Sequence, residues 1–212
     1  MEVKIFVNNP WGENTILLYD ETKEAVVIDC GCFSEEERKR FASFLSDNGL
    51  VLKGILNTHL HIDHIFGNGF VKETYGLEPQ ANEGDNYLIE EALNYAKMMG
   101  ITGIEQPPAI GHFLQDGDVV KFGTTELKVI ATPGHSPGGL CFYSEKDHLL
   151  VSGDTLFSGS VGRSDLPGGN GSQLLQGIKS KLFILPDDVV VIPGHGPQTT
   201  IREEKLYNPF FA

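Results

Sequence analysis

The chain is built from short apolar runs that are separated by glycine, proline and charged residues. Many of these runs are rich in valine, isoleucine and leucine and are too short for a typical helix, which favours buried strands. A first group falls at residues 3–7, 15–19, 25–29 and 54–57, and a second at residues 119–122, 127–130, 139–143, 149–152 and 189–191. The first three runs follow one another closely and predict an antiparallel meander.

Segments with helical spacing of apolar residues lie between these strands. Ser34 precedes one of them and Glu37 follows three residues later, which is the pattern of a capping box, and the apolar face carries Phe41, Phe44 and Leu45. Further helices are predicted over residues 68–75, 82–100 and 173–183. In the second of these, tyrosines and methionines at helical spacing favour a helix packed on the core over a cover for a functional site.

Length and composition are those of a globular protein. A chain of 212 residues, 40% of them hydrophobic, can bury one sizeable core, and no linker divides it. The 25 glycines and 11 prolines are scattered instead of forming one low-complexity tract, so many short strands and loops are expected. The sequence therefore predicts a single domain, residues 1–212, of the α/β (α+β) class with two strand-rich halves.

The charge distribution bears on the choice of partner. The formal net charge is -13, and the 16 lysines and arginines are dispersed along the chain. No basic stripe is available to neutralise a phosphate backbone, so we expect no nucleic-acid partner. No apolar run reaches the roughly 20 residues that span a bilayer, so we expect no membrane partner. The sequence carries no signature of an oligomeric state.

Features of the amino terminus and the cysteines indicate the compartment. The first seven residues alternate charged and apolar side chains, unlike the basic and then apolar order of a signal peptide. The three cysteines, Cys30, Cys32 and Cys141, are odd in number and form no paired framework. We therefore expect a cytoplasmic protein in which these cysteines are small buried residues.

One cluster of polar residues follows directly after the predicted strand at 54–57. His59, His61, Asp63 and His64 lie within six residues of one another. In an extended segment His59 and His61 point to the same side, so both can reach one metal ion. If a helix starts after them, Asp63 and His64 point in a new direction and can serve a second ion.

Three more candidate ligands follow later strands. His135 lies in a glycine-flanked loop after the strand at 127–130, and Asp154 comes just after the strand at 149–152. His195 follows the strand at 189–191 in the sequence Pro193-Gly194-His195-Gly196. Because each residue stands at the end of an apolar strand, we expect the three to join the upstream cluster in one metal site.

These motifs, in this order, resemble those of the metallo-β-lactamase superfamily, and the resemblance covers nearly the whole chain. It implies a four-layer αββα sandwich with the metals at one edge, between the two halves. By this resemblance the first metal would be held by His59, His61, His135 and Asp154, and the second by Asp63, His64, Asp154 and His195. Asp154 would then bridge the ions, and Asp63 and Asp154 are the carboxylates assigned to catalysis.

Within the superfamily the sequence resembles short bacterial glyoxalase II-like enzymes, also called hydroxyacylglutathione hydrolases. Gly153 to Phe157, followed by Gly162-Arg163, is similar to that branch, in which a basic residue at the Arg163 position contacts the glutathione moiety. Two departures concern the substrate: the chain lacks the long carboxyl-terminal helical region of glyoxalase II, and it has no tyrosine directly after His195.

The resemblance implies a metal-dependent hydrolase acting on a small thioester, such as a glutathione conjugate. Two divalent ions roughly 3.5–4 Å apart share a water and lower its pKa from about 15.7 toward 7, which would supply a metal-bridging hydroxide as the nucleophile. Zinc is the expected metal, with iron and manganese as alternatives. Neither Ser136 nor Cys141 shows the arrangement of a covalent nucleophile.

Two alternatives to the thioesterase stay open. Persulfide dioxygenases share the sequence Gly162-Arg163-Ser164-Asp165 and bind a single iron through two histidines and an aspartate, which His59, His135 and Asp154 could supply. A protein that binds metal without catalysis is the other alternative.

Overall fold

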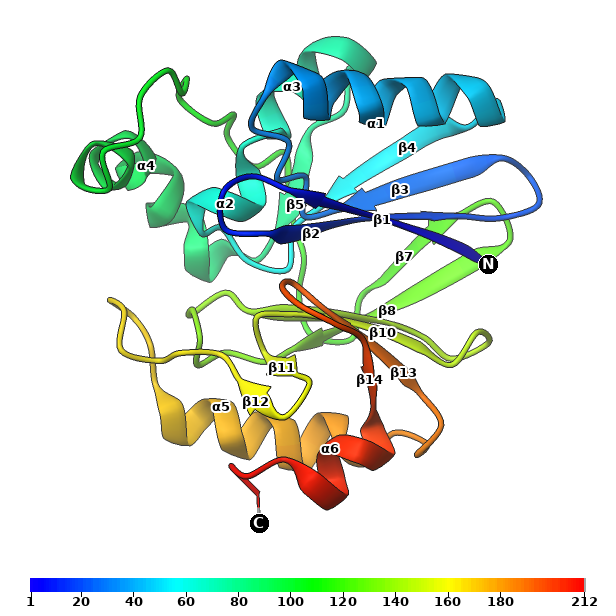
Figure 1. The fold of residues 1–212 in the computed structure, drawn as a ribbon. Helices are drawn as coiled ribbons and strands as arrows, with labels where there is room; N and C mark the ends of the chain where they lie inside the picture. Colours follow the sequence, from blue (N-terminus) through cyan, green and yellow to red (C-terminus); the bar gives the residue numbers. More distant parts are fainter. Residues whose placement is uncertain (212) are drawn as a thin grey trace.

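The computed structural model describes residues 1–211, and Ala212, the last residue of the predicted domain, lies outside them. Two six-stranded sheets pack face to face, and helices cover the outer face of each sheet (Figure 1). The four-layer αββα arrangement expected from the sequence is therefore confirmed.

The first sheet contains the amino-terminal strands in sequence order. Its strands are β1 (Glu2–Asn8), β2 (Glu13–Tyr19), β3 (Glu24–Ile28), β4 (Val51–Leu56), β5 (Pro79–Ala81) and β6 (His112–Phe113). Strands β1 to β3 form the predicted antiparallel meander, and β3 to β6 pair in parallel. The short strands β5 and β6 were not predicted, because two or three residues carry no periodic pattern.

The second sheet has the order β14-β13-β10-β9-β8-β7. Its strands are β7 (Val119–Phe122), β8 (Thr125–Ala131), β9 (Leu140–Ser144), β10 (Leu149–Gly153), β13 (Val190–Pro193) and β14 (Thr199–Thr200). Strands β7 to β10 are antiparallel neighbours, whereas β10 and β13 are parallel. A small hairpin, β11 (Leu156–Phe157) and β12 (Ser160–Val161), follows β10.

The helices belong to three places in the fold. Above the first sheet lie α1 (Glu35–Asn48) and α3 (Asn68–Tyr75), and below the second lie α5 (Gly171–Gly177), its π-helical continuation (Ile178–Leu182) and α6 (Ile201–Tyr207) (Figure 1). At one edge of the sandwich lie α2 (Ile62–Ile65), a short 3₁₀ helix (Glu83–Asp85) and α4 (Asn86–Met98). The capping box of α1 is confirmed, because the Ser34 hydroxyl accepts from the backbone of Glu37 and the Glu37 carboxylate accepts from that of Ser34.

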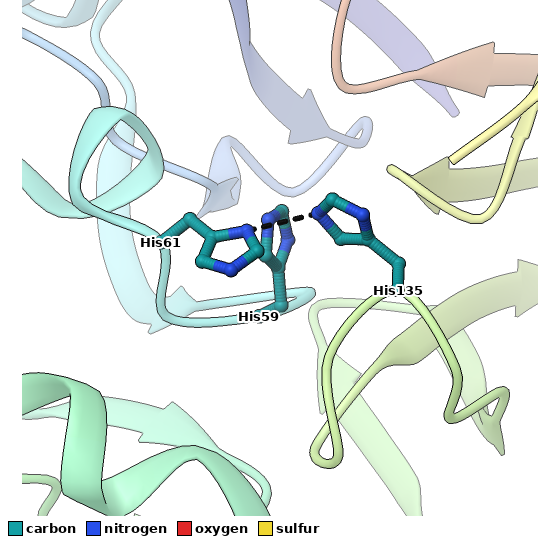
Figure 2. Close-up of side chains that lie close together, drawn as sticks. All are labelled: His59, His61 and His135. Carbon is teal, nitrogen blue, oxygen red and sulfur yellow. Dashed lines mark hydrogen bonds between the residues drawn. The ribbon is translucent and has the colours of Figure 1, made fainter. Parts of the chain in front are cut away.

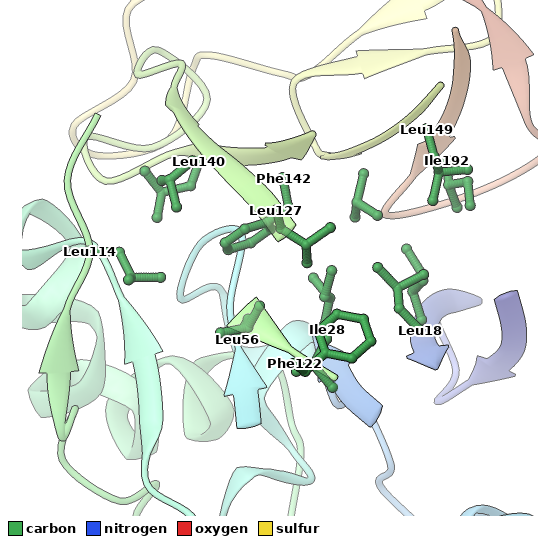
Figure 3. Packing of buried hydrophobic residues seen from close by; sticks show 14 residues of the cluster. Leu18, Ile28, Leu56, Leu114, Phe122, Leu127, Leu140, Phe142, Leu149 and Ile192 are labelled. Carbon is green, nitrogen blue, oxygen red and sulfur yellow. The ribbon is translucent and has the colours of Figure 1, made fainter. Parts of the chain in front are cut away.

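Alternation along the strands explains the layers. Ile16 and Leu18 of β2 point between the sheets, while Leu17 points outward against the helices. Phe142 of β9 is fully buried in the inner cluster (Figure 3). Strands buried on both faces read as continuous apolar runs, which is why the sequence displays them so clearly.

The carboxyl ends of β3, β4, β8, β10 and β13 point to the same edge of the sandwich, where their loops gather (Figure 1). The candidate metal ligands of the sequence all follow one of these strands. None of the helices within residues 1–211 is both long enough and apolar enough to cross a membrane.

Candidate metal centre

The structure brings all seven candidate ligands together at this edge, between the two sheets. His59 lies in the loop after β4, His61 precedes α2, and Asp63 and His64 lie on α2. The helix thus begins where the sequence suggested a change of direction. The other three ligands come from the second half, after β8, β10 and β13: His135, Asp154 and His195.

His59, His61 and His135 form the first ligand set, in which one ring nitrogen of each residue lies within 4.8 Å of the others. The rings point toward a common centre, with His61 Nδ1 and His135 Nε2 2.9 Å apart (Figure 2). His59 Nε2 is buried and has no hydrogen-bond partner. A buried imidazole nitrogen without a partner is costly unless a ligand satisfies it, and a metal ion is the ligand that suits three imidazoles.

Asp63, His64 and His195 form the second ligand set, in which one ligand atom of each residue also lies within 4.8 Å of the others. His195 Nε2 lies 3.2 Å from Asp63 Oδ2 and 3.2 Å from His64 Nε2. His64 is fully buried, whereas Asp63 and His195 are partly exposed, so this set reaches the surface through those two side chains. Imidazole and carboxylate donors suit a divalent ion.

Asp154 lies between the two sets. Its Oδ2 atom is 3.6 Å from His135 Nε2 and 3.8 Å from His195 Nε2, and its Oδ1 atom is 3.6 Å from His64 Nε2. Oδ1 is buried without a hydrogen-bond partner. A carboxylate that reaches histidines of both sets is placed to bind two ions at once.

The outward ring nitrogens of three of these histidines are fixed by the protein. His135 Nδ1 donates to the Arg163 carbonyl at 2.7 Å, and His195 Nδ1 donates to the Trp11 carbonyl at 3.2 Å. His64 Nδ1 donates to the Asp29 carboxylate at 3.1 Å. Each bond selects the tautomer whose Nε2 lone pair points into the site, which is the arrangement that metal-binding histidines use.

Asp29, directly after β3, is the functional residue that the sequence analysis missed. Its carboxylate accepts from the Thr58 backbone at 2.7 Å and from the Thr58 hydroxyl at 2.6 Å, besides its bond to His64. Since the Thr58 hydroxyl proton is used in that bond, its oxygen accepts from His59 Nδ1, 3.0 Å away. Asp29 therefore orients one histidine of each set. An acidic residue ending an apolar strand, as at Asp154, was the available signal.

The loop that carries His195 is held by the first half of the chain. The Asn14 side chain on β2 donates to the carbonyls of Pro193 and Gly196, at 2.9 and 3.0 Å, and its backbone donates to Gly194. A side chain at Gly194 would collide with the Asp154 carboxylate and the His64 ring, so only glycine permits this close approach.

The two sets differ in their charge when no metal is bound. Burial lowers the pKa of His59 well below its usual range, and burial together with His135 lowers the pKa of His61 to about 4. Burial also acts on His64 and His195, but the Asp63 and Asp154 carboxylates outweigh it and raise the pKa of both imidazoles. At neutral pH His59 and His61 are therefore uncharged, whereas His64 is protonated.

The carboxylates of the centre remain ionised at neutral pH. Burial acts to raise the pKa of Asp63 and of Asp154, but the charge of His64 outweighs it and lowers both below the usual range of an aspartate. A pair of ionised carboxylates among five imidazoles gives a donor set with the charge that divalent cations require.

Arg163 lies beside the centre, with its side chain mostly exposed. Its guanidinium makes a two-pronged ion pair with Asp165, in which both nitrogen to oxygen distances are 2.8 Å. This pair lowers the pKa of Asp165 to about 2. An exposed ion pair contributes little stability, so Arg163 can exchange Asp165 for an anionic ligand at small cost.

Sequence comparisons identify relatives of this chain. The family model for the metallo-beta-lactamase superfamily matches residues 8–195. The hydroxyacylglutathione hydrolase GloC of Haemophilus influenzae is 34% identical over 211 residues, which cover 99% of this chain and 98% of that protein.

Solved structures show the same likeness. The crystal structure of the B3 metallo-beta-lactamase BLEG-1 superimposes with a TM-score of 0.91 at 34% identity, and the match covers 100% of both chains. The crystal structure of TTHA1623 in a di-iron-bound form gives a TM-score of 0.87 at 36% identity, over 98% of this chain and 100% of that one.

The unequal protonation of the two sets predicts unequal proton release when metal binds. An ion at the set of Asp63, His64 and His195 displaces protons, so its affinity should rise by roughly tenfold per pH unit for each proton released. Binding of an ion at the set of His59, His61 and His135 should release fewer protons at neutral pH, because His59 and His61 are already uncharged above the His61 pKa of about 4. Calorimetric titration of metal in buffers of different ionisation enthalpy counts the protons at each step.

A His195→Ala variant serves as the control, because it keeps the first set and removes one proton-holding group of the second. It should release fewer protons than the natural chain. Equal proton release at both steps would contradict the assignment of charge given above.

Proposed function

The chain belongs to the metallo-β-lactamase superfamily, and from that premise we propose that it is a dinuclear metal-dependent hydrolase that cleaves small thioesters. The observation that carries the proposal is Asp154, which lies within 4 Å of histidines from both ligand sets. We assign His59, His61, His135 and Asp154 to the first ion, and Asp63, His64, Asp154 and His195 to the second. The continuous core between the sheets also supports treating the chain as a single domain.

Bound together, two divalent ions would supply a water of lowered pKa and Lewis-acid stabilisation of the oxyanion. The residues of the chain prepare this chemistry. Asp29 and the Arg163 carbonyl hold imidazoles in the tautomer that presents Nε2 to the site. The Asp63 carboxylate, ionised at neutral pH, is available to accept the proton of the attacking water. The water oxygen then bonds to the thioester carbonyl carbon, the C–S bond breaks, and Asp63 passes the proton on to the departing sulfur, so the products are the carboxylic acid and the thiol.

A thioester substrate, with glutathione as one source of the thiol, is supported by the resemblance to GloC and by the position of Arg163. Zinc is the metal that we propose first, and the di-iron form of TTHA1623 makes iron the alternative. We propose that the protein acts in the cytoplasm, where its three buried cysteines would stay reduced.

The direct test is hydrolysis of S-lactoylglutathione by the metal-loaded protein, with chelator-treated protein as the blank. Oxygen consumption with glutathione persulfide is measured in parallel. A single-iron dioxygenase would need only one ligand set, whereas this chain builds a second one from Asp63, His64 and His195. Hydrolysis without oxygen consumption is the expected result, and oxygen consumption without hydrolysis would overturn the proposal.

The bridging role of Asp154 predicts that Asp154→Ala loses more metal than Asp63→Ala. Asp154 approaches three histidines of the two sets, whereas Asp63 approaches only His64 and His195. We expect Asp63→Ala to retain about one ion per chain and Asp154→Ala to retain well under one, with activity falling in the same order. Elemental analysis of the purified variants measures this.

A matched control is Asp188→Ala, which removes a carboxylate paired with His148 on the surface. It should keep the metal content of the natural chain. Near-equal metal loss in the Asp154 and Asp63 variants, with both folded by circular dichroism, would rule out the bridge.

Arg163 predicts an effect on substrate binding. An anionic substrate meets an unfavourable overall field in a protein of charge -13, so a basic group beside the site must attract it locally. Arg163→Ala should raise KM for S-lactoylglutathione by up to about tenfold and leave kcat nearly unchanged. The orientation of His135 is retained, because His135 bonds the backbone carbonyl of residue 163.

Steady-state kinetics with S-lactoylglutathione and with a neutral thioester make this measurement, and Arg202→Ala on α6 is the matched surface control. A KM that is unchanged for both substrates would show that Arg163 does not bind substrate. An equal rise for both substrates would exclude charge pairing as the reason.

A further inference from the structure

A cavity of about 160 Å³ opens beside the metal centre, and we call it the α4 pocket. His61 of the first ligand set and Asp63 of the second both line it, so a molecule that occupies it reaches both sets. Arg163 lines it as well. A larger cavity of about 270 Å³ lies next to Phe66 and Phe70 and is lined by none of the seven ligands, so it is separate from this chemistry.

One face of α4 makes the wall of the α4 pocket. The lining residues Leu88, Ala92, Tyr95 and Met99 follow one another at intervals of four, three and four, which places them along a single stripe of the helix. Leu88 also packs into the core, as the sequence predicted for this helix. Met99, just past the helix end, is 52% exposed at the outer end of the stripe. Helix α4 therefore packs against the core and also lines the α4 pocket.

Four further lining residues are apolar, and the wall that they form is held in place. These residues are Leu60, Ile62, Leu166 and Pro167. The Tyr87 hydroxyl on α4 donates to the Pro167 carbonyl at 3.0 Å, which ties two walls together.

The start of α4 is tied to the metal loops by a buried carboxylate. Asp85 accepts from the Leu60 backbone at 3.2 Å, from the Ser136 hydroxyl at 2.8 Å and from the Gly138 backbone at 2.6 Å. These partners belong to the loops that carry His59 and His135. The pocket is thus formed before a substrate arrives, which lowers the ordering cost of binding.

We infer that the α4 pocket binds one apolar arm of the substrate, a group about the size of a benzene ring or a short branched alkyl chain. This inference rests on the proposed function and adds the substrate class. An apolar cavity of about 150 Å³ is known to hold one benzene molecule, whereas pockets that enclose a drug-sized ligand measure roughly 300–1,000 Å³.

The mostly apolar walls disfavour a peptide in this pocket. Its side chains with polar groups are the metal-side residues His61 and Asp63, together with Arg163 and Tyr95. Peptide amides lying against Leu88, Ala92 or Met99 would lose their hydrogen bonds to water without gaining others. A glutathione moiety would therefore lie outside the pocket, near Arg163, and the apolar arm would enter along α4.

The test is a series of thioesters of one hydrophilic thiol with acyl groups from acetyl to octanoyl, plus phenylacetyl. A second series places the same groups on the thiol side of an acetyl thioester, and so identifies which side of the C–S bond enters the pocket. In one of the series, kcat/KM should rise by about fourfold per added methylene until the pocket is full, and fall beyond that size.

Two variants test the pocket itself. Ala92→Phe fills it and should abolish the gain with arm size, whereas Leu93→Phe, at the next position and 41% exposed, should leave the gain intact. Met99→Ala, at a half-exposed position where folding is not at risk, should shift the preferred arm to a longer one. Calorimetric binding of the non-hydrolysable benzyl thioether of the same thiol should weaken at least tenfold in Ala92→Phe only.

The two proposals fail in different ways. If no thioester is hydrolysed but the thioether binds and Ala92→Phe removes that binding, the pocket stands and the hydrolase proposal falls. If thioesters are hydrolysed at rates independent of arm size, in the natural chain and in Ala92→Phe alike, the inference about the α4 pocket is wrong.

Discussion

The convergence of five imidazoles and two carboxylates in a largely buried space is the constraint on which the rest of this structure depends. Such a set is costly to bury without a cation, because lone pairs that face one another repel and the nitrogens lose their hydrogen bonds to water. His59 Nε2 and Asp154 Oδ1 show this directly, since both are buried without a partner. The hydrogen bonds to the outward ring nitrogens turn the inward lone pairs toward one point, which is the arrangement that a shared metal ion requires.

Polar residues of the first half of the chain hold this convergence together across the two sheets. Asn14 on β2 fixes the loop of His195, which follows a strand of the second sheet. Asp85 at the start of α4 fixes the loop of His135. Asp29 orients His59 through Thr58 and orients His64 directly. The metal centre and the α4 pocket are therefore products of the same set of buried side-chain hydrogen bonds.

Much of the fold could be predicted because its strands are buried on both faces and appear as unbroken apolar runs. The candidate ligands could be recognised in the sequence because histidines and aspartates rarely gather directly after apolar strands. Asp29 was overlooked although it ends an apolar strand as Asp154 does. Asn14 and Asp85 could not be recognised, since each resembles an ordinary turn residue until the loop that it holds is brought beside it. The position of Tyr95 and Met99 on a cavity was not predicted either, because helical spacing does not tell whether an apolar face meets the core or an open pocket.

Metal stoichiometry tests most directly whether one chain holds two metal ions on shared ligands. The protein is purified without added chelator, supplemented with zinc in one preparation and with iron in another, and freed of loosely bound metal before elemental analysis. We expect close to two transition-metal ions per chain and thioester hydrolysis that disappears when they are removed. A reproducible single iron, with no second ion taken up after supplementation, would contradict this expectation.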